Sequence, residues 1–173
     1  KTVAEERGIQ VIITTHSTVI SAAVSLDHII HISNDARPVA IPLSACGLPE
    51  HSRRFVDRWL DVTKSNLLFS KGALLVEGIA EAMVLPELAR IVLRPYGEGK
   101  NCLDDYGVSV INLGGIYFKH FMQLFCDVTG EQPGENVPIR CAGLTDNDPP
   151  KSILSIDDGK GGKKDVPYQP HAD

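Results

Sequence analysis

The stretch of sequence that decides the fold runs from residue 73 to residue 93 and reads ALLVEGIAEAMVLPELARIVL. Its first four residues form a short apolar run, which is typical of a buried parallel strand. Gly78 allows the backbone to turn tightly, and from residue 79 the apolar residues continue as a helix of about four turns. A strand that leads directly into a helix predicts a β-α-β unit.

The same alternation continues downstream of this stretch. Residues 108–113 and 139–145 have the composition of strands, residues 117–128 that of a helix, and turn-forming residues fill the connections between them. Strands that alternate with helices indicate an α/β fold, with a mainly parallel, Rossmann-like sheet flanked by helices.

The segment upstream of residue 69 contains further elements. The run 10–14 is apolar and β-branched, as in a buried parallel strand, and Ser17 is positioned to cap a helix that begins near residue 18. The patterns also predict a hairpin of strands 28–32 and 38–43, followed by an amphipathic connecting helix over 50–64.

Acidic residues follow two of the predicted strands. Glu77 ends the first strand and Glu81 lies four residues later on the first turn of the helix, while Asp146 and Asp148 follow the strand 139–145. The carboxyl ends of parallel strands meet at one edge of a sheet, so we expect these four carboxylates to lie close together. Such a cluster needs cations, and hard oxygen ligands favour two Mg²⁺ or Mn²⁺ ions, the arrangement used for phosphodiester displacement.

These motifs resemble the Toprim (topoisomerase–primase) domain over roughly residues 69–150. The resemblance rests on LLVEGIAE at 74–81, VINLGG at 110–115 and GLTDND at 143–148. It implies that Glu77 is the Toprim glutamate, a metal ligand or general base, and that Asp146 and Asp148 are the DxD metal ligands.

The resemblance also assigns supporting residues. Glu81 matches the second acidic residue of one nuclease branch of the family, and the backbone of Gly78, Gly114 and Gly115 shapes the site. Asn147 is interpreted as a turn residue. Members of this family use a further lysine near the scissile phosphate, and no position of this sequence matches it.

The run VIITTHS at 11–17 is similar to the end of an ABC-type ATPase domain, in which a strand leads into a switch histidine. An ATPase end followed by Toprim is the arrangement of the OLD (overcoming lysogenization defect) nucleases. The resemblance implies that His16 contacts ATP, although helix capping by the Thr15-His16-Ser17 turn is the alternative. No phosphate-binding G-x-x-x-x-G-K-[ST] loop occurs, so ATP binding is expected only in a longer protein, and a homodimer is implied by the ATPase resemblance.

These readings divide the chain into four parts. They are the C-terminal piece of an ABC-type ATPase domain (1–48), a connecting helix (49–68), the Toprim nuclease core (69–150) and a flexible or incomplete segment (151–173). The composition of both ends indicates a piece of a longer protein.

Composition limits the partners of the chain. The net charge is −5, with 17 Lys and Arg against 22 Asp and Glu, so contacts with DNA must be local rather than due to an overall basic field. Candidates for phosphate contacts are Arg53, Arg54, Arg58 and Lys160, Lys163, Lys164, although a solvated surface is the simpler reading.

The spacing of the cysteines and the length of the apolar runs bear on the cellular compartment of the protein. The four cysteines are widely spaced and form no CxxC pair, which indicates a reducing cytoplasm, and Cys141 is interpreted as a small core residue. The apolar runs are far shorter than the roughly 18 residues of a spanning helix, so we expect no membrane association.

The sequence therefore predicts a metal-dependent DNA endonuclease of the OLD type, regulated by an ATPase domain. Two alternatives stay open. One is another Toprim activity, topoisomerase or primase, although no tyrosine lies in a motif for nucleophilic attack. The other is a non-catalytic module that binds Mg²⁺ and DNA.

Overall fold

The computed structural model describes residues 6–34, 38–96, 99–126 and 136–146, together with the backbone of 153–157 and 163–167. Its helices and strands are α2 Thr18–Ala22, β1 Ile30–Asn34, β2 Pro38–Pro42, α3 Glu50–Trp59, β3 Gly72–Val76, α4 Ile79–Leu93, β4 Val108–Asn112, α5 Phe118–Met122, β5 Arg140–Leu144, β6 Ile153–Asp157 and β7 Lys163–Pro167. Short 3-10 helices lie at Leu26–His28, Leu43–Ala45, Lys64–Leu68 and Asp104–Tyr106. Within this part of the chain, no helix has the length and apolar character needed to cross a membrane.

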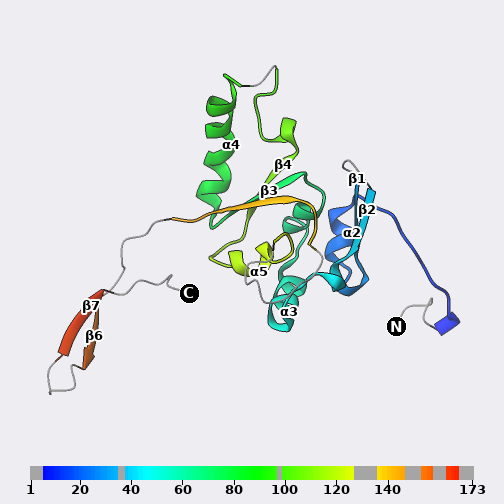
Figure 1. Ribbon diagram of the computed structural model, residues 1–173, viewed down its shortest axis with the longest axis horizontal. Helices are drawn as coiled ribbons and strands as arrows, with labels where there is room; N and C mark the ends of the chain where they lie inside the picture. Colours follow the sequence, from blue (N-terminus) through cyan, green and yellow to red (C-terminus); the bar gives the residue numbers. More distant parts are fainter. Residues whose placement is uncertain are drawn as a thin grey trace.

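A parallel three-stranded sheet forms the centre of the molecule, in the order β4-β3-β5 (Figure 1). The α/β fold predicted from the sequence is confirmed, with β3 as the middle strand. The chain leaves β3 through α4 to reach β4 on one side, and returns through α5 to reach β5 on the other. Because both crossovers are right-handed by preference, the two helices cover opposite faces of the sheet.

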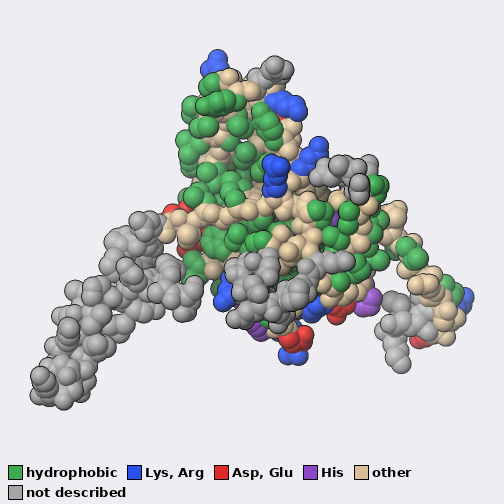
Figure 2. Space-filling view, viewed as in Figure 1, with side chains coloured by type: hydrophobic (Ala, Val, Ile, Leu, Met, Phe, Trp, Pro, Cys, Tyr) green, Lys and Arg blue, Asp and Glu red, His purple; other side chains and the backbone are tan. Residues whose placement is uncertain are grey.

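The core lies on the face of the sheet that α5 and α3 cover. Leu75 of β3, Ile111 of β4 and Phe121 of α5 are all at most 3% exposed and belong to one apolar cluster with Val56 of α3. On the other face α4 has no buried residue. Figure 2 shows hydrophobic side chains gathered over α4, in agreement with the exposure of Val84, Leu88 and Ile91.

The segment before the sheet is fastened to helix α3. β1 and β2 form the predicted antiparallel hairpin, although its first strand begins at Ile30 because Leu26–His28 is a 3-10 helix. The Asp57 carboxylate accepts a hydrogen bond from the Leu26 N–H at 2.8 Å, and Arg53 forms a 2.6 Å ion pair with Asp27. Downstream, β6 pairs with β7 in antiparallel fashion within the stretch 151–173.

The strand expected at residues 10–14 is not formed. These residues have no regular structure, and Val11, Ile12 and Ile13 are 60–83% exposed. A strand is stable only when its backbone groups find partners in a neighbouring strand, and no strand of the described residues pairs with this run. Its composition alone is therefore insufficient.

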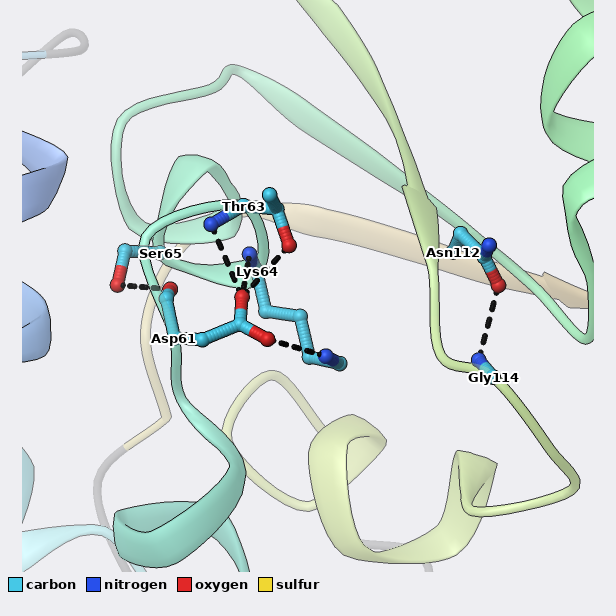
Figure 3. A network of polar contacts seen from close by, with 6 residues as sticks. All are labelled: Asp61, Thr63, Lys64, Ser65, Asn112 and Gly114. Carbon is cyan, nitrogen blue, oxygen red and sulfur yellow. Dashed lines mark hydrogen bonds and ion pairs between the residues drawn. The ribbon is translucent and has the colours of Figure 1, made fainter.

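Two predicted helices are shorter than expected. The helix over 50–64 ends at Trp59 because the Asp61 carboxylate accepts hydrogen bonds from the backbone N–H groups of Thr63 and Lys64, both at 2.9 Å (Figure 3). This local bonding starts a new 3-10 turn instead. The helix over 117–128 is only α5, because the N–H groups of Leu124 and Phe125 bond to carbonyls three residues back.

The Asp61 carboxylate makes the fold sensitive to acid. Desolvation acts to raise its pKa, but hydrogen bonds from Lys64 and Thr63 outweigh this and lower the pKa to about 2, below the ordinary value of 3.8. A lowered folded-state pKa stabilises the protein above the unfolded value, and this stability is lost as the pH falls from 3.8 towards 2.

The wild type should lose unfolding free energy between about pH 5 and pH 2, and Asp61→Asn should lose less over the same range. Because the Asp61 side chain is half exposed, we expect the difference between the two losses to be below about 1 kcal/mol. Urea denaturation at several pH values measures this, with Asp104→Asn as the control for removing one negative charge. Equal acid sensitivity of wild type and Asp61→Asn contradicts the prediction.

Candidate active site

The three parallel strands end at a common edge. Val76 of β3 is in register with Asn112 of β4 and with Leu144 of β5. The residues that follow, beginning with Glu77 after β3 and Thr145 after β5, therefore lie next to each other at this edge. In open α/β sheets this is where ligands bind.

Glu77 is held at this edge by the end of strand β5. The Thr145 hydroxyl donates a hydrogen bond to Glu77 Oε2 at 2.8 Å, across 68 positions of the chain. Asp146 follows Thr145 directly and is exposed. The structure thus brings Glu77 beside the start of the acidic turn, as the strand-end argument predicts.

Thr145 was missed by the sequence analysis. The signal that could have found it is its place as the last residue before Asp146, where a side chain can reach the neighbouring strand end. Gly143 was missed as well. A Cβ atom on Gly143 would lie 2.8 Å from the Phe118 ring, so a glycine is needed for α5 to pack closely against β5.

Glu81 is engaged in starting helix α4. Its Oε2 accepts a hydrogen bond from the Gly78 N–H at 3.0 Å, which is the glutamate half of a capping box at the N-terminus of the helix. This contact draws the Glu81 carboxylate back towards the strand end, and its second oxygen has lone pairs for a cation.

The four predicted metal ligands are not all described. Glu77, Glu81 and Asp146 are placed, whereas Asp148 and Asn147 lie outside the described residues. Among the described residues, no group of three or more His, Cys, Asp or Glu side chains is close enough to hold a metal ion. The carboxylates that are placed, two after neighbouring strand ends and one on the first turn of α4, are hard oxygen donors, a donor type that fits Mg²⁺ or Mn²⁺.

Gly114 and Gly115 form the turn at the end of β4, and both have positive φ angles, +69° and +152°. The Gly114 N–H bonds to the Asn112 side chain at 2.8 Å (Figure 3), and the Gly115 N–H bonds to the Glu77 carbonyl at 2.9 Å. The turn therefore fixes the backbone of Glu77 from the side opposite to Thr145.

The two glycines allow a matched experiment. A Cβ at Gly115 would lie 2.7 Å from the Tyr117 ring, whereas a Cβ at Gly114 has nothing within 4 Å. Both substitutions with alanine carry the strain of a positive φ, about 1–3 kcal/mol, and only Gly115→Ala also displaces the ring. We expect Gly115→Ala to lower the free energy of unfolding more than Gly114→Ala, as measured by urea denaturation. A larger loss for Gly114→Ala contradicts this.

His16 lies away from the acidic residues in the chain order and on an exposed, extended segment before α2. Its ring is 5.9 Å from that of Phe69. The Ser17 hydroxyl accepts the Ile20 N–H at 3.4 Å, so the predicted cap of α2 is confirmed. The interpretation of His16 as an ATP-contacting residue stays a prediction.

Cys141, within β5, is not suited to nucleophilic chemistry. Burial, with a smaller effect of Cys126, raises the pKa of its thiol to about 12. The thiol is therefore protonated at neutral pH, which agrees with its interpretation as a packing residue.

Part of the chain matches a known protein family. Residues 68–148 match the family model described as "Overcoming lysogenization defect protein-like, TOPRIM domain". No curated protein matches the chain. The matched residues contain the whole β4-β3-β5 sheet, both of its crossover helices and the acidic edge. The match indicates a metal-binding domain of the nuclease type, and residues 68–148 therefore have the fold of an OLD-like Toprim domain.

Proposed function

We propose that this chain contributes the catalytic domain of a metal-dependent DNA endonuclease. The observation that carries the proposal is the Glu77 carboxylate at the end of the central strand, hydrogen-bonded to Thr145 and next to Asp146, inside the Toprim match. The proposed reaction is hydrolysis of a phosphodiester bond in DNA.

Metal ions suit the donor set at this edge. Toprim domains generally bind Mg²⁺. We propose that Glu77 and Asp146 hold one ion, and that Asp148 and Glu81 help to hold a second. Bound there, the two ions supply charge neutralisation for the phosphate and a water molecule of lowered pKa.

The protein residues contribute position and hydrogen bonding. The Thr145 hydroxyl donates to Glu77 Oε2, so Oε1 is the atom available as metal ligand or proton acceptor. The Gly115 N–H donates to the Glu77 carbonyl and holds its backbone in place. Glu81 binds the Gly78 N–H and so stabilises the turn that presents Glu77. A carboxylate held from two sides is preorganised for its task, because little reorganisation is needed when substrate binds.

The remaining parts of the proposal concern the longer protein. We propose that residues 1–48 end an ABC-type ATPase domain that regulates cleavage, that ATP binds only with the rest of that domain, and that the protein is a cytoplasmic homodimer. The support is the resemblance of the VIITTHS sequence before α2 to the end of an ATPase domain. Later in the same segment, Leu26 and Asp27 are held to α3 by a hydrogen bond and an ion pair.

The proposal is tested by plasmid nicking in EDTA, Mg²⁺ and Mn²⁺. Nicking that requires the metal and is lost in Glu77→Ala and Asp146→Ala supports a nuclease at this edge. A covalent protein–DNA intermediate would instead favour the topoisomerase alternative, and nucleotide polymerisation the primase alternative. Metal binding in calorimetry without any cleavage would favour the non-catalytic module.

A further inference from the structure

A group of stacked aromatic rings lies beside the acidic edge and has no part in the proposed chemistry. Phe55 and Trp59 of α3 stack with centroids 5.8 Å apart, and Trp59 stacks on Tyr117 at 5.9 Å with an interplanar angle of 27°. Phe55 also stacks on His120 of α5 at 4.4 Å. We call Trp59 and Tyr117 the ring pair.

The ring pair is exposed to solvent, and the residues on which it packs are held in place. Trp59 is 43% exposed and Tyr117 is 37% exposed. Beneath them, Phe55 packs edge-on against the buried Phe121, and His120 is fixed by a 2.9 Å hydrogen bond to the buried Ser52. Large aromatic surfaces that are held in place but left exposed are typical of binding surfaces.

The ring pair is connected directly to the candidate active site. The Tyr117 ring packs against Gly115, where any Cβ atom would meet it at 2.7 Å. The Gly115 N–H in turn bonds to the Glu77 carbonyl at 2.9 Å. Two contacts therefore separate the rings from the backbone of the central acidic residue.

Two exposed basic residues adjoin the aromatic residues in the sequence. Lys119 of α5 and Arg58 of α3 are exposed, and each neighbours an aromatic residue of the group in the sequence. Arg53 and Arg54 are instead engaged in ion pairs with Asp27 and Glu50. Exposed cations in the same two segments of the chain as exposed rings match a ligand that has both flat faces and phosphates.

We propose that Trp59 and Tyr117 form a stacking site for an unpaired base, with Lys119 and Arg58 contacting adjacent phosphates. Bases in a duplex are stacked on each other and present no free face, whereas bases of a single strand do. The inference rests on the proposed nuclease function and narrows its substrate class to DNA that contains unpaired nucleotides, at single-stranded segments, flaps or gaps, near the acidic edge.

The single tryptophan of the chain makes the proposal directly measurable. Trp59 fluorescence is titrated with an oligo(dT) strand and with a duplex of equal length, in EDTA and at about 50 mM salt, where phosphate contacts are strong. EDTA prevents cleavage, so the signal reports binding alone. We expect quenching by the single strand at concentrations where the duplex leaves the fluorescence unchanged.

Variants at Tyr117 separate stacking from structure. Tyr117→Ala should raise the Kd for the single strand about 5- to 100-fold, while Tyr117→Phe, which keeps the ring, should stay within about twofold. Tyr96→Ala, which removes a 79% exposed tyrosine in the turn after α4, is the matched control and should have no effect. A loss in Tyr117→Phe equal to that in Tyr117→Ala would overturn the stacking role.

The outcomes distinguish this inference from the proposed function. Glu77→Ala should lose cleavage and keep the quenching. Cleavage by the wild type without quenching, or equal quenching by duplex and single strand, overturns the stacking site and leaves the nuclease intact. Quenching by the single strand without cleavage under any metal supports the stacking site and counts against the nuclease.

Discussion

Replacing Glu77 or Asp146 with alanine is expected to lower the metal-dependent cleavage rate by about 100-fold or more, without unfolding the protein. This is the size of the loss when a single group that stabilises transition-state charge is removed from an enzyme. Neither side chain belongs to the buried core, so the free energy of unfolding should change little. Single-turnover nicking in Mg²⁺ and in Mn²⁺ measures the rate.

Matched variants make this test specific. Glu87→Ala removes an exposed glutamate of α4 that is paired with Arg90, and should cleave like the wild type. Thr145→Val removes the hydroxyl that holds Glu77 and should cost about 10- to 100-fold, the cost typical of lost outer-sphere partners, while Thr145→Ser should restore most of the rate. Full activity of Glu77→Ala or Asp146→Ala would show that the activity comes from another site or a contaminant.

Replacing Phe121 with alanine should lower the free energy of unfolding by about 3–5 kcal/mol. The side chain is 1% exposed and lies between the sheet and α3, so its removal leaves a cavity that neighbours cannot easily fill. Urea denaturation measures the loss.

Ile91→Ala provides the control for this core variant. Ile91 is 71% exposed on the outer side of α4, and its truncation should stay within about 0.5 kcal/mol of the wild type. Equal losses for the two variants would mean that the outer side of α4 is covered in solution, or that Phe121 does not bridge the layers.

Local signals account for the parts of the fold that the sequence predicts well. The helix expected from residue 79 to 93 is α4, Ile79–Leu93, because Gly78 marks the turn after the strand and the apolar helical pattern begins directly after it. The strands β3 and β4 are bounded by glycines and turns in the same way. These signals are read without knowing any distant neighbour.

The misses come from interactions that composition does not determine, with a distant strand in one case and with the adjacent backbone in the other. The run at 10–14 has the composition of a strand, yet a strand also needs a partner, which composition does not supply. The early end of α3 depends on whether Asp61 bonds to its own following backbone or faces solvent, and both are compatible with the helical pattern.

The candidate site also has features that the sequence predicts and features that it does not. The positions of Glu77 and Asp146 follow from the rule that parallel strands end at one edge, so they are predictable from strand order alone. The Thr145 contact and the capping role of Glu81 depend on side-chain rotamers. They therefore become visible only in the structure.

The place of β3 in the middle of the sheet has a consequence for how the protein is made. Its second neighbour, β5, is encoded about 68 residues later, which at ordinary synthesis rates means about 3–14 s of further translation. Closing a loop of that length costs about 4 kcal/mol in its length-dependent entropy, so β5 joins only when its own core contacts can form. Until then one edge of β3 stays open and Glu77 lacks both Thr145 and Asp146. A nascent chain therefore cannot carry an assembled acidic edge, and any cleavage activity must appear only after β5 has been synthesised and has docked.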